Sequence, residues 1–524
     1  MKQSVQRRWA LLLALILITG VCFLFAGRKQ GMFIDEIYTF GLSNSSYSPF
    51  LGGLKYGSIE HRVFTRAELL DYVSVMGDEG FDVGSVYYNQ VHDVHPPLYY
   101  WLFNFASTLA KGSFSMWIGL VLDYVIYLGC ALMLYALVRR LGGSRLNGAA
   151  AAVLYGLSLI GLSTMLMIRM YVLLTLLTVV LAYFVADLML DFKKRTCLFV
   201  GLTLLAGLLT QYYFVFYAFF LCAAYVVWAL VKKQYRALAW FVPCALIGAL
   251  SLLLVFPAAL DHLFSGELVS GESALDNLKN LAQYPARFKV FFGAARHGLK
   301  AAIFTALAAL AALLVCRVRG RKAEIRGEWL VLILPAFVTL VLVAVISPVD
   351  EPRYIYNIMP LFVLAVSFLL DLLERACEGV KYRERAAAAV FLAIAALALW
   401  EARSAPPDYL YPEHAGYNAV LKEHSASPCV FFAEPEWAFV PMTEDLMQLL
   451  IFPEVYVTDQ KSLQPMLDYV GDADEAVVFI DISKFWSSGY DDAALIRRIK
   501  AETDYTKAEQ LFTIGLSTTY LISK

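Results

Sequence analysis

Apolar residues occur along this chain in runs of about twenty, a length that matches the hydrocarbon thickness of a bilayer. Short polar or basic stretches separate the runs. The pattern predicts eleven membrane-crossing helices. The predicted spans are 9–26, 115–138, 146–165, 170–190, 196–211, 213–231, 238–257, 298–316, 329–346, 355–373 and 385–401.

A further apolar stretch, residues 96–110, decides the topology. If it crosses the membrane, every later loop changes side; if it lies along the interface, all five basic loops fall on one side. Because lysine and arginine concentrate in cytoplasmic loops, the second arrangement is favoured, with 96–110 as an interfacial amphipathic helix and a cytoplasmic N-terminus. The basic residues preceding the first span and in the five loops are Lys2/Arg7/Arg8, Arg139/Arg140/Arg145, Lys193/Lys194/Arg195, Lys232/Lys233/Arg236, Arg317/Arg319/Arg321/Lys322/Arg326 and Lys381/Arg383/Arg385.

Two polar regions then lie outside the membrane. The first is the loop 27–95, with a helical pattern near 65–76. The second is the tail from about residue 404, where short strands are predicted at 429–433, 455–458, 476–482 and 511–514, with helices at 413–424, 441–451, 462–470 and 491–502 between them. This alternation indicates a small α/β domain.

The predicted fold class is therefore an all-α polytopic membrane protein with about eleven transmembrane helices and interfacial helices in its first outer loop. A membrane domain, 1–403, precedes a C-terminal extracytoplasmic α/β domain, 404–524. The expected location is the plasma (inner) membrane.

Composition agrees with this class. Of 524 residues, 60% are hydrophobic, far more than a soluble protein of this size needs. The net charge of −1 gives no reason to expect a nucleic-acid partner. The eight cysteines stand singly without CxxC spacing, which argues against a disulfide framework or a thiolate metal site.

Candidate chemistry gathers on the outer side. Asp35 and Glu36 follow shortly after the first span. Carboxylates this close to hydrocarbon either face water or serve a site. A solvated interfacial pair is the alternative.

The segment His92-Asp93-Val94-His95-Pro96-Pro97 ends the first outer loop. Its prolines fix the backbone at the head of the interfacial helix. Histidine beside a carboxylate can bind a divalent metal, contact a phosphate or transfer a proton. The alternative is a proline-rich turn whose histidines only cap the helix.

Two arginines occupy short outer turns, in Arg169-Met170-Tyr171 and in Asp350-Glu351-Pro352-Arg353-Tyr354. The forked donors of a guanidinium suit a phosphate. Arg169 could instead extend to the lipid headgroups, and Arg353 could pair with Asp350 or Glu351.

Thr210-Gln211-Tyr212-Tyr213 supplies polar and aromatic groups at the same level. A sugar face or an isoprenoid chain could rest on these side chains. Anchoring in the aromatic belt of the membrane surface is the alternative.

Taken in order, these segments resemble the C-type (GT-C) integral-membrane glycosyltransferases. The resemblance is strongest to bacterial relatives of protein O-mannosyltransferase and of the lipid A aminoarabinose transferase, the family 39-like enzymes. It covers residues 1 to about 400 and leaves the tail unassigned. The matching segments are Asp35-Glu36, Asp93-Val94-His95-Pro96-Pro97-Leu98-Tyr99-Tyr100, Arg169-Met170-Tyr171, Thr210-Gln211-Tyr212-Tyr213 and Arg353-Tyr354.

The resemblance implies transfer of a sugar from a polyprenyl phosphate, such as undecaprenyl phosphate, at the outer face. The acceptor would be a glycan, a lipid or a protein, and membrane lipid is a further partner. Asp35 would act as general base. Glu36 and Asp93 would assist it, or Asp35, Asp93 and His92 would bind a divalent cation (Mg²⁺, Mn²⁺ or Zn²⁺). The residues expected to bind the donor and its phosphate are His95, Arg169, Tyr171, Gln211, Tyr212, Arg353 and Tyr354.

One position departs from the family pattern. Many relatives carry Glu two residues before the arginine, where this chain has Met167. An inactive binding subunit with the same fold is therefore one alternative. A lipid or solute transporter is another. Transporters place ionisable groups near the bilayer midplane, whereas these spans carry few internal charges; Asp123 and Asp187 are exceptions, and Asp187 is near a cytoplasmic end.

Overall fold

The computed structural model describes residues 9–52, 59, 61–77, 79–264, 276–321, 323–484 and 489–524. Lys2, Arg7, Arg8 and Lys322, on which the topology prediction drew, lie outside these ranges. The chain divides into two compact units. The membrane unit comprises Met1–Gly27, Val94–Tyr99 and Leu120–Asp408, and the loop–tail unit comprises Arg28–Asp93, Tyr100–Gly119 and Tyr409–Lys524.

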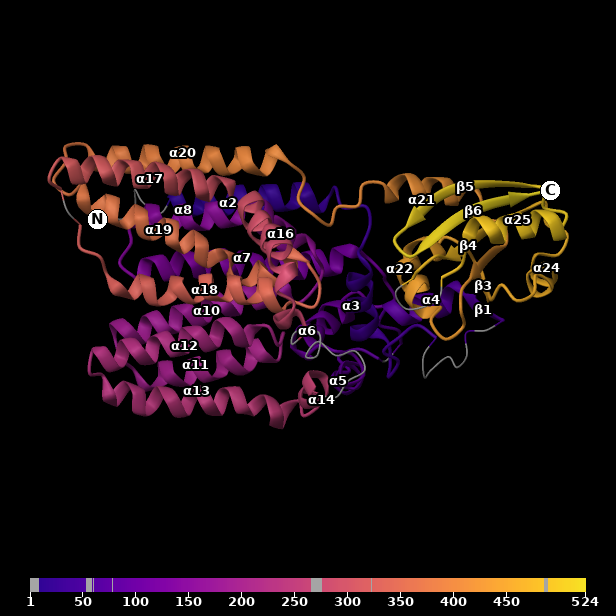
Figure 1. The fold of residues 1–524 in the computed structure, drawn as a ribbon, viewed down its shortest axis with the longest axis horizontal. Helices are drawn as coiled ribbons and strands as arrows, with labels where there is room; N and C mark the ends of the chain where they lie inside the picture. Colours follow the sequence, from indigo (N-terminus) through magenta and orange to yellow (C-terminus); the bar gives the residue numbers. More distant parts are fainter. Residues whose placement is uncertain are drawn as a thin grey trace. The chain divides into compact units, whose positions relative to one another are not determined.

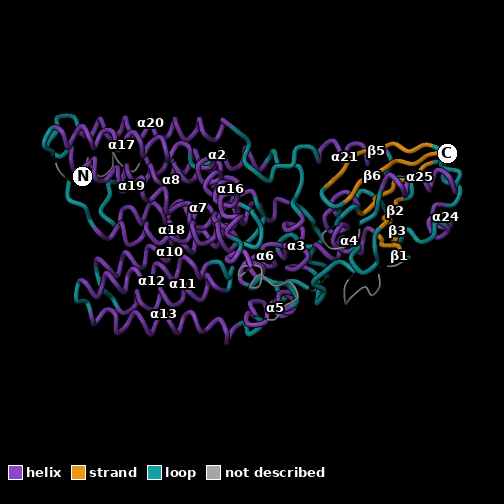
Figure 2. Tube along the Cα trace, viewed as in Figure 1, coloured by secondary structure: helices purple, strands orange, loops and turns teal. Residues whose placement is uncertain are grey.

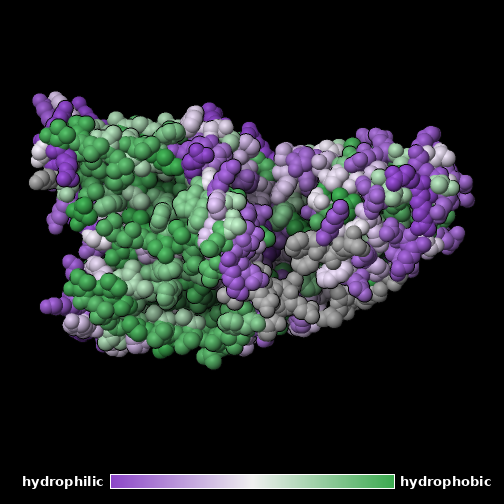
Figure 3. Space-filling view, in the orientation of Figure 1, coloured by the Kyte–Doolittle hydropathy of each residue, from purple (hydrophilic) through white to green (hydrophobic). Residues whose placement is uncertain are grey.

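The membrane unit is a bundle of long apolar helices (Figure 1). In the described part of the chain, nine helices are long and apolar enough to cross a membrane, and Figure 3 shows apolar side chains over their outer surface. The protein is therefore a multi-pass membrane protein. The nine are α2 (Trp9–Ala26), α7 (Met116–Arg140), α10 (Tyr171–Leu190), α12 (Phe214–Val231), α13 (Tyr235–Val255), α17 (Lys300–Val318), α18 (Gly327–Ile346), η2 with α19 (Pro352–Ile358 and Met359–Ala376) and α20 (Arg383–Ser404).

Two predicted spans differ in detail. The span predicted at 146–165 is a pair of helices, α8 (Arg145–Gly156) and α9 (Leu159–Leu166), bent by 61° at the break. The Ser158 hydroxyl accepts the Gly161 N–H at 3.1 Å and so starts a new helix where the chain turns. The span predicted at 196–211 is α11 (Lys194–Leu208), whose 15 residues reach only about 22 Å.

The stretch predicted to lie along the interface contains α6 (Leu98–Thr108). Its 11 residues extend about 16 Å, too short to cross about 30 Å of hydrocarbon. This length fits a helix that does not span the bilayer. Its position at the interface stays a prediction.

The loop–tail unit is built on a mixed six-stranded sheet (Figure 2). The strand order is β1-β3-β2-β4-β6-β5; β2 pairs in parallel with β3 and β4, and the other pairs are antiparallel. The strands are β1 (Arg62–Thr65), β2 (Cys429–Phe432), β3 (Glu454–Thr458), β4 (Glu475–Asp481), β5 (Lys507–Ile514) and β6 (Ser517–Ser523), and the tail helices are α21 (His414–Glu423), α22 (Phe439–Glu444), α23 (Leu446–Leu449), α24 (Gln464–Val470) and α25 (Asp492–Glu502).

The sheet confirms the predicted α/β character of the tail and adds two strands, β1 and β6. One buried cluster packs α24 and α25 against the sheet, with Val478, Ile480 and Ile499 fully buried. Burial of such side chains is the main stabilising term in a domain of this size.

The first outer loop folds together with the tail. It contains α3 (Ile34–Asn44), β1, α4 (Arg66–Val73) and α5 (Val83–Val91). β1 pairs with β3, and the rings of Phe50 and Phe439 lie 5.3 Å apart between centroids. The predicted boundary at 404 kept this loop with the helices, whereas the structure groups it with residues 409–524.

Candidate functional site

Arg169 and His95 meet in the membrane unit. Arg169 follows α9 directly, and its Nη2 atom lies 3.5 Å from both ring nitrogens of His95. Only 4% of Arg169 is exposed. The guanidinium is a forked donor and a neutral imidazole carries one ring N–H, so an anion is a ligand that both side chains can bind.

A backbone hydrogen bond joins the His-Pro-Pro segment to the turn after α11. The Leu98 N–H donates to the Leu209 carbonyl at 2.9 Å. Gln211, in that turn, is 5% exposed, and the Tyr212 hydroxyl lies 3.0 Å from Nδ1 of His262. The predicted donor-binding residues His95, Gln211 and Tyr212 therefore come from segments that contact one another.

The turn carrying Arg353 reaches the same region through two tyrosines. The rings of Tyr213 and Tyr354 lie 4.8 Å apart between centroids at 37°. Tyr171, at the start of α10, makes an edge contact with Tyr356 of η2, at 6.3 Å. The structure thus joins the segments of Arg169, Gln211 and Arg353 by direct contacts inside one unit.

Arg287 supports this turn and was missed from the sequence. It lies in α16 (Tyr284–Gly298), is 4% exposed, and donates to the Ala344 carbonyl and the Ser347 hydroxyl at 2.9 and 2.6 Å. Its Nη1 also lies 3.2 Å from Asp350. Asp350 therefore pairs with Arg287. The available signal was a charged side chain in the first turn of a helix rich in aromatic residues.

Glu401 is a second residue that the sequence analysis did not single out. Its buried carboxylate accepts the N–H groups of Leu159, Lys300 and Ala301 at 3.4, 3.2 and 2.6 Å. It thereby caps the N-termini of both α9 and α17. Because α9 leads directly to Arg169, this cap positions a predicted donor-binding residue.

The acidic residues of the first loop lie in the loop–tail unit. Glu36 forms a fully buried ion pair with Lys29, whose Nζ lies 3.0 and 3.1 Å from its two carboxylate oxygens. Glu36 also accepts the Phe33 N–H at 2.7 Å, which caps α3. Lys29 donates further to the Tyr409 carbonyl at 2.6 Å. These contacts hold Glu36 in a structural position, and its predicted catalytic role stays a prediction.

Asp35 occupies the same helix turn but is only half-buried. Burial raises the pKa of the nearby Tyr38 hydroxyl above its usual range, and the carboxylates of Asp35 and Asp93 raise it further, while the Thr443 hydroxyl lowers it. Both predicted carboxylates therefore act on Tyr38. They come from α3 and from the residues after α5.

His92 is exposed and is not grouped with these acids. Its Nδ1 lies 2.9 Å from the Tyr88 carbonyl, and its ring contacts the Tyr88 ring at 4.3 Å between centroids. Within the described ranges, no three His, Cys, Asp or Glu side chains gather as metal ligands do. The described residues do not bring Asp35, Asp93 and His92 together as a three-ligand set, so we derive no step through a metal ion.

The two acids that stood out within the spans have protein partners. The Tyr99 hydroxyl donates to Asp123 at 2.7 Å, with both side chains buried. Asp187 pairs with Arg140 at 2.7 Å and accepts from the Thr196 hydroxyl at 3.0 Å. Neither acid requires a transported ion to explain its position.

The fold is that of the GT-C membrane glycosyltransferases, as the sequence resemblance predicted. The solved structure of ArnT from Cupriavidus metallidurans bound to undecaprenyl phosphate has a TM-score of 0.53 at 12% identity, over 97% of each chain. An oligosaccharyltransferase of Archaeoglobus fulgidus has a TM-score of 0.44 at 11% identity, over 84% of this chain and 63% of that one. The mycobacterial arabinofuranosyltransferase AftD has 0.44 at 14% identity, over 99% and 40%. No family model and no curated protein sequence matches the chain.

Proposed function

We propose that the protein is a membrane glycosyltransferase that moves a sugar from a polyprenyl-phosphate donor to an acceptor hydroxyl at the outer face of the plasma (inner) membrane. The observation that carries the proposal is the buried Arg169 beside His95. The backbone bond from Leu98 to Leu209 and the tyrosine pair at Tyr354 join the other donor-binding segments to them. The similarly folded ArnT structure contains undecaprenyl phosphate, which supports a lipid phosphate as the ligand.

Asp35 is assigned the role of general base. Of the two adjacent carboxylates, Glu36 is held by Lys29 and by the α3 backbone, whereas Asp35 is half-buried and partly accessible. Asp35 takes the proton of the acceptor hydroxyl as that oxygen attacks the anomeric carbon. Asp93 assists it in orienting the acceptor.

The bond that breaks joins the anomeric carbon to the phosphate oxygen. The polyprenyl phosphate leaves with the electron pair of that bond, so negative charge grows on its oxygen. His95, Arg169 and Arg353 would stabilise this charge, because preformed hydrogen-bond donors act most strongly in a water-poor site. Tyr171, Gln211, Tyr212 and Tyr354 would hold the sugar and the first isoprene units.

Incubating the purified full chain in lipid with a panel of polyprenyl-phosphate sugars tests the reaction class. The proposal predicts that one donor is consumed and that its sugar appears on an acceptor. Binding of a donor without consumption would favour an inactive binding subunit, which the buried Met167 at the position of a family glutamate would explain. Absence of both binding and consumption would contradict the proposal and return the transporter to consideration.

A further inference from the structure

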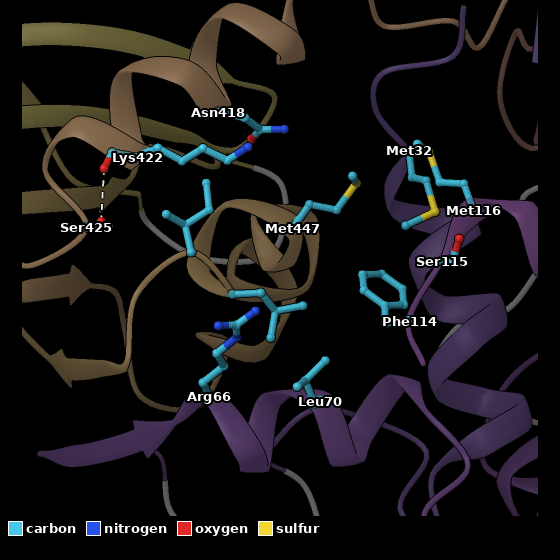
Figure 4. Close-up of a pocket in the computed structure, with 12 residues that line it drawn as sticks. Met32, Arg66, Leu70, Phe114, Ser115, Met116, Asn418, Lys422, Ser425 and Met447 are labelled. Carbon is cyan, nitrogen blue, oxygen red and sulfur yellow. Dashed lines mark hydrogen bonds between the residues drawn. The ribbon is translucent and has the colours of Figure 1, made fainter. Parts of the chain in front are cut away.

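The loop–tail unit contains a cavity of about 550 Å³ that none of the residues assigned above lines. Figure 4 shows Met32, Phe114 and Met116 on one side of it and Lys422 on the other, with Met447 between them. Arg66 and Leu70 reach it from α4. The remaining lining residues are Ser115, Asn418, Ser425, Leu450 and Ile451.

The charge of this cavity is wholly positive. Arg66 and Lys422 are its charged lining residues, and no Asp or Glu lines it. Among the described residues, neither the Arg66 nor the Lys422 side chain makes an ion pair or a hydrogen bond. Asn418 accepts the Gln448 amide through its Oδ1 at 3.0 Å, which leaves its NH₂ group as a further donor. Two unpaired cations and an amide donor favour an anionic ligand.

Most of the lining is apolar. Seven of the twelve lining residues are Met, Leu, Ile or Phe, and three of these are methionines, whose flexible thioethers adapt to irregular hydrocarbon surfaces. A free inorganic anion would leave this wall in contact with water. The ligand must therefore carry an apolar portion as well as a negative charge.

Two residues of the apolar lining, Met32 and Met116, lie in the sequence at or near the ends of membrane-crossing helices. Met116 is the first residue of the membrane-crossing helix α7. Met32 lies six residues after Ala26, the last residue of α2. Six residues of fully extended chain span at most about 20 Å. A membrane lipid is an anionic amphiphile of this kind, and the chain itself connects the cavity lining to the ends of two membrane-crossing helices.

We propose that this cavity binds an anionic phospholipid of the outer leaflet. Its phosphate contacts Arg66 and Lys422, and its glycerol and first acyl carbons rest on Met32, Met116 and Met447. None of the donor-binding residues lines this cavity, and the inference does not depend on the glycosyltransferase proposal. Bound lipid would hold the loop–tail unit at an anionic membrane surface.

Binding of short-chain phosphatidylglycerol to the purified full chain in detergent, measured by native mass spectrometry, tests this proposal. Phosphatidylcholine of the same chain length is the lipid control. The double variant Arg66→Gln/Lys422→Gln removes both cations at exposed positions and should bind phosphatidylglycerol about thirtyfold more weakly. Arg497→Gln/Lys500→Gln on α25 removes the same charge from the same unit, outside the cavity, and should bind like the wild type.

A thermal midpoint equal to that of the wild type shows that each variant is folded. If the double variant is not folded, the two single variants provide the test, and each is expected to weaken binding partially. Glycerol 3-phosphate, which lacks acyl chains, should fail to displace the lipid at equal concentration. Equal binding of both lipids, equal weakening by both double variants, unchanged binding in the cavity variant, or displacement by glycerol 3-phosphate would each overturn the proposal.

Discussion

The Nη2 atom of Arg169 lies 3.5 Å from both ring nitrogens of His95, although 74 residues separate them in the chain. Arg169 follows α9, and His95 opens the segment that the Leu98–Leu209 hydrogen bond fastens to the turn after α11. Each residue is therefore held by a different part of the bundle. Their proximity depends on the packing of the whole membrane unit.

Replacing Arg169 tests this pair as a phosphate site. Arg169→Ala should weaken binding of a polyprenyl-phosphate sugar by about thirtyfold or more, because a buried charge-assisted contact is lost. Arg169→Lys should recover only part of the affinity, since a point charge lacks the planar fork. Titration of the donor against purified protein measures both, with Arg236→Ala at an exposed position as the control. Wild-type affinity in Arg169→Ala would contradict the assignment.

The Lys29–Glu36 pair predicts a large effect on stability. Lys29→Met leaves a buried carboxylate without its cation, so the free energy of unfolding should fall by about 3–5 kcal/mol. The double variant Lys29→Met/Glu36→Leu should recover part of this loss. Lys461→Met removes a lysine whose own side chain is 81% exposed from its pair with the buried Asp459, and it should have a much smaller effect. Equal unfolding midpoints for Lys29→Met and Lys461→Met would show that the buried pair is not structural.

The double cap at Glu401 predicts a coupling between stability and donor binding. Glu401→Ala leaves three helix N–H groups without their acceptor, which should lower the free energy of unfolding by about 2 kcal/mol. Donor affinity should fall as well, because α9 leads to Arg169. Glu384→Ala, at the opposite end of α20, is the matched control. A variant that loses stability but keeps full donor affinity would show that the Glu401 cap does not position the donor-binding residues.

Asp445 predicts a dependence of stability on pH. Burial raises the pKa of its carboxyl well above the usual value, Glu444 and Asp481 raise it further, and the Ser517 hydroxyl, at 2.5 Å, lowers it. The folded chain then keeps a proton that the unfolded chain releases above about pH 4. Unfolding releases this proton, so stability should fall as pH rises from about 4 towards the raised pKa of the folded state.

Asp445→Asn cannot lose that proton. Its thermal midpoint should therefore exceed that of the wild type near neutral pH and should change less with pH. Burial also raises the pKa of the Glu444 carboxyl, so the stability of this variant should still fall with rising pH, but with a smaller slope. A wild-type pH profile in Asp445→Asn would contradict this origin of the dependence.

The helical half of the fold was predictable because the signal is local. Each of the eleven predicted spans contains a helix, since runs of apolar residues report membrane crossing directly. The break at Ser158 and the short α11 were not predictable in the same way. They depend on Ser158 capping a new helix and on the turn at Leu209.

The sequence supplies candidate site residues but not the partners of their side chains. Asp35 and Glu36 are adjacent in the sequence, and only the structure shows that Lys29 engages one of them. The partner of Asp350 proved to be Arg287, more than sixty residues away. β1 has four residues and pairs with a strand nearly four hundred positions later, a contact that no local pattern encodes.

The central claim is that Asp35 performs the chemistry while other residues hold the donor. Asp35→Asn keeps the size of the side chain and removes the base. Donor binding and sugar transfer should be measured together for this variant and for Asp504→Asn, an exposed aspartate of the same unit that makes no described side-chain contact. The account predicts that Asp35→Asn binds the donor like the wild type and transfers its sugar about 10²- to 10⁴-fold more slowly, with Asp504→Asn unchanged. Transfer by Asp35→Asn at the wild-type rate would contradict it.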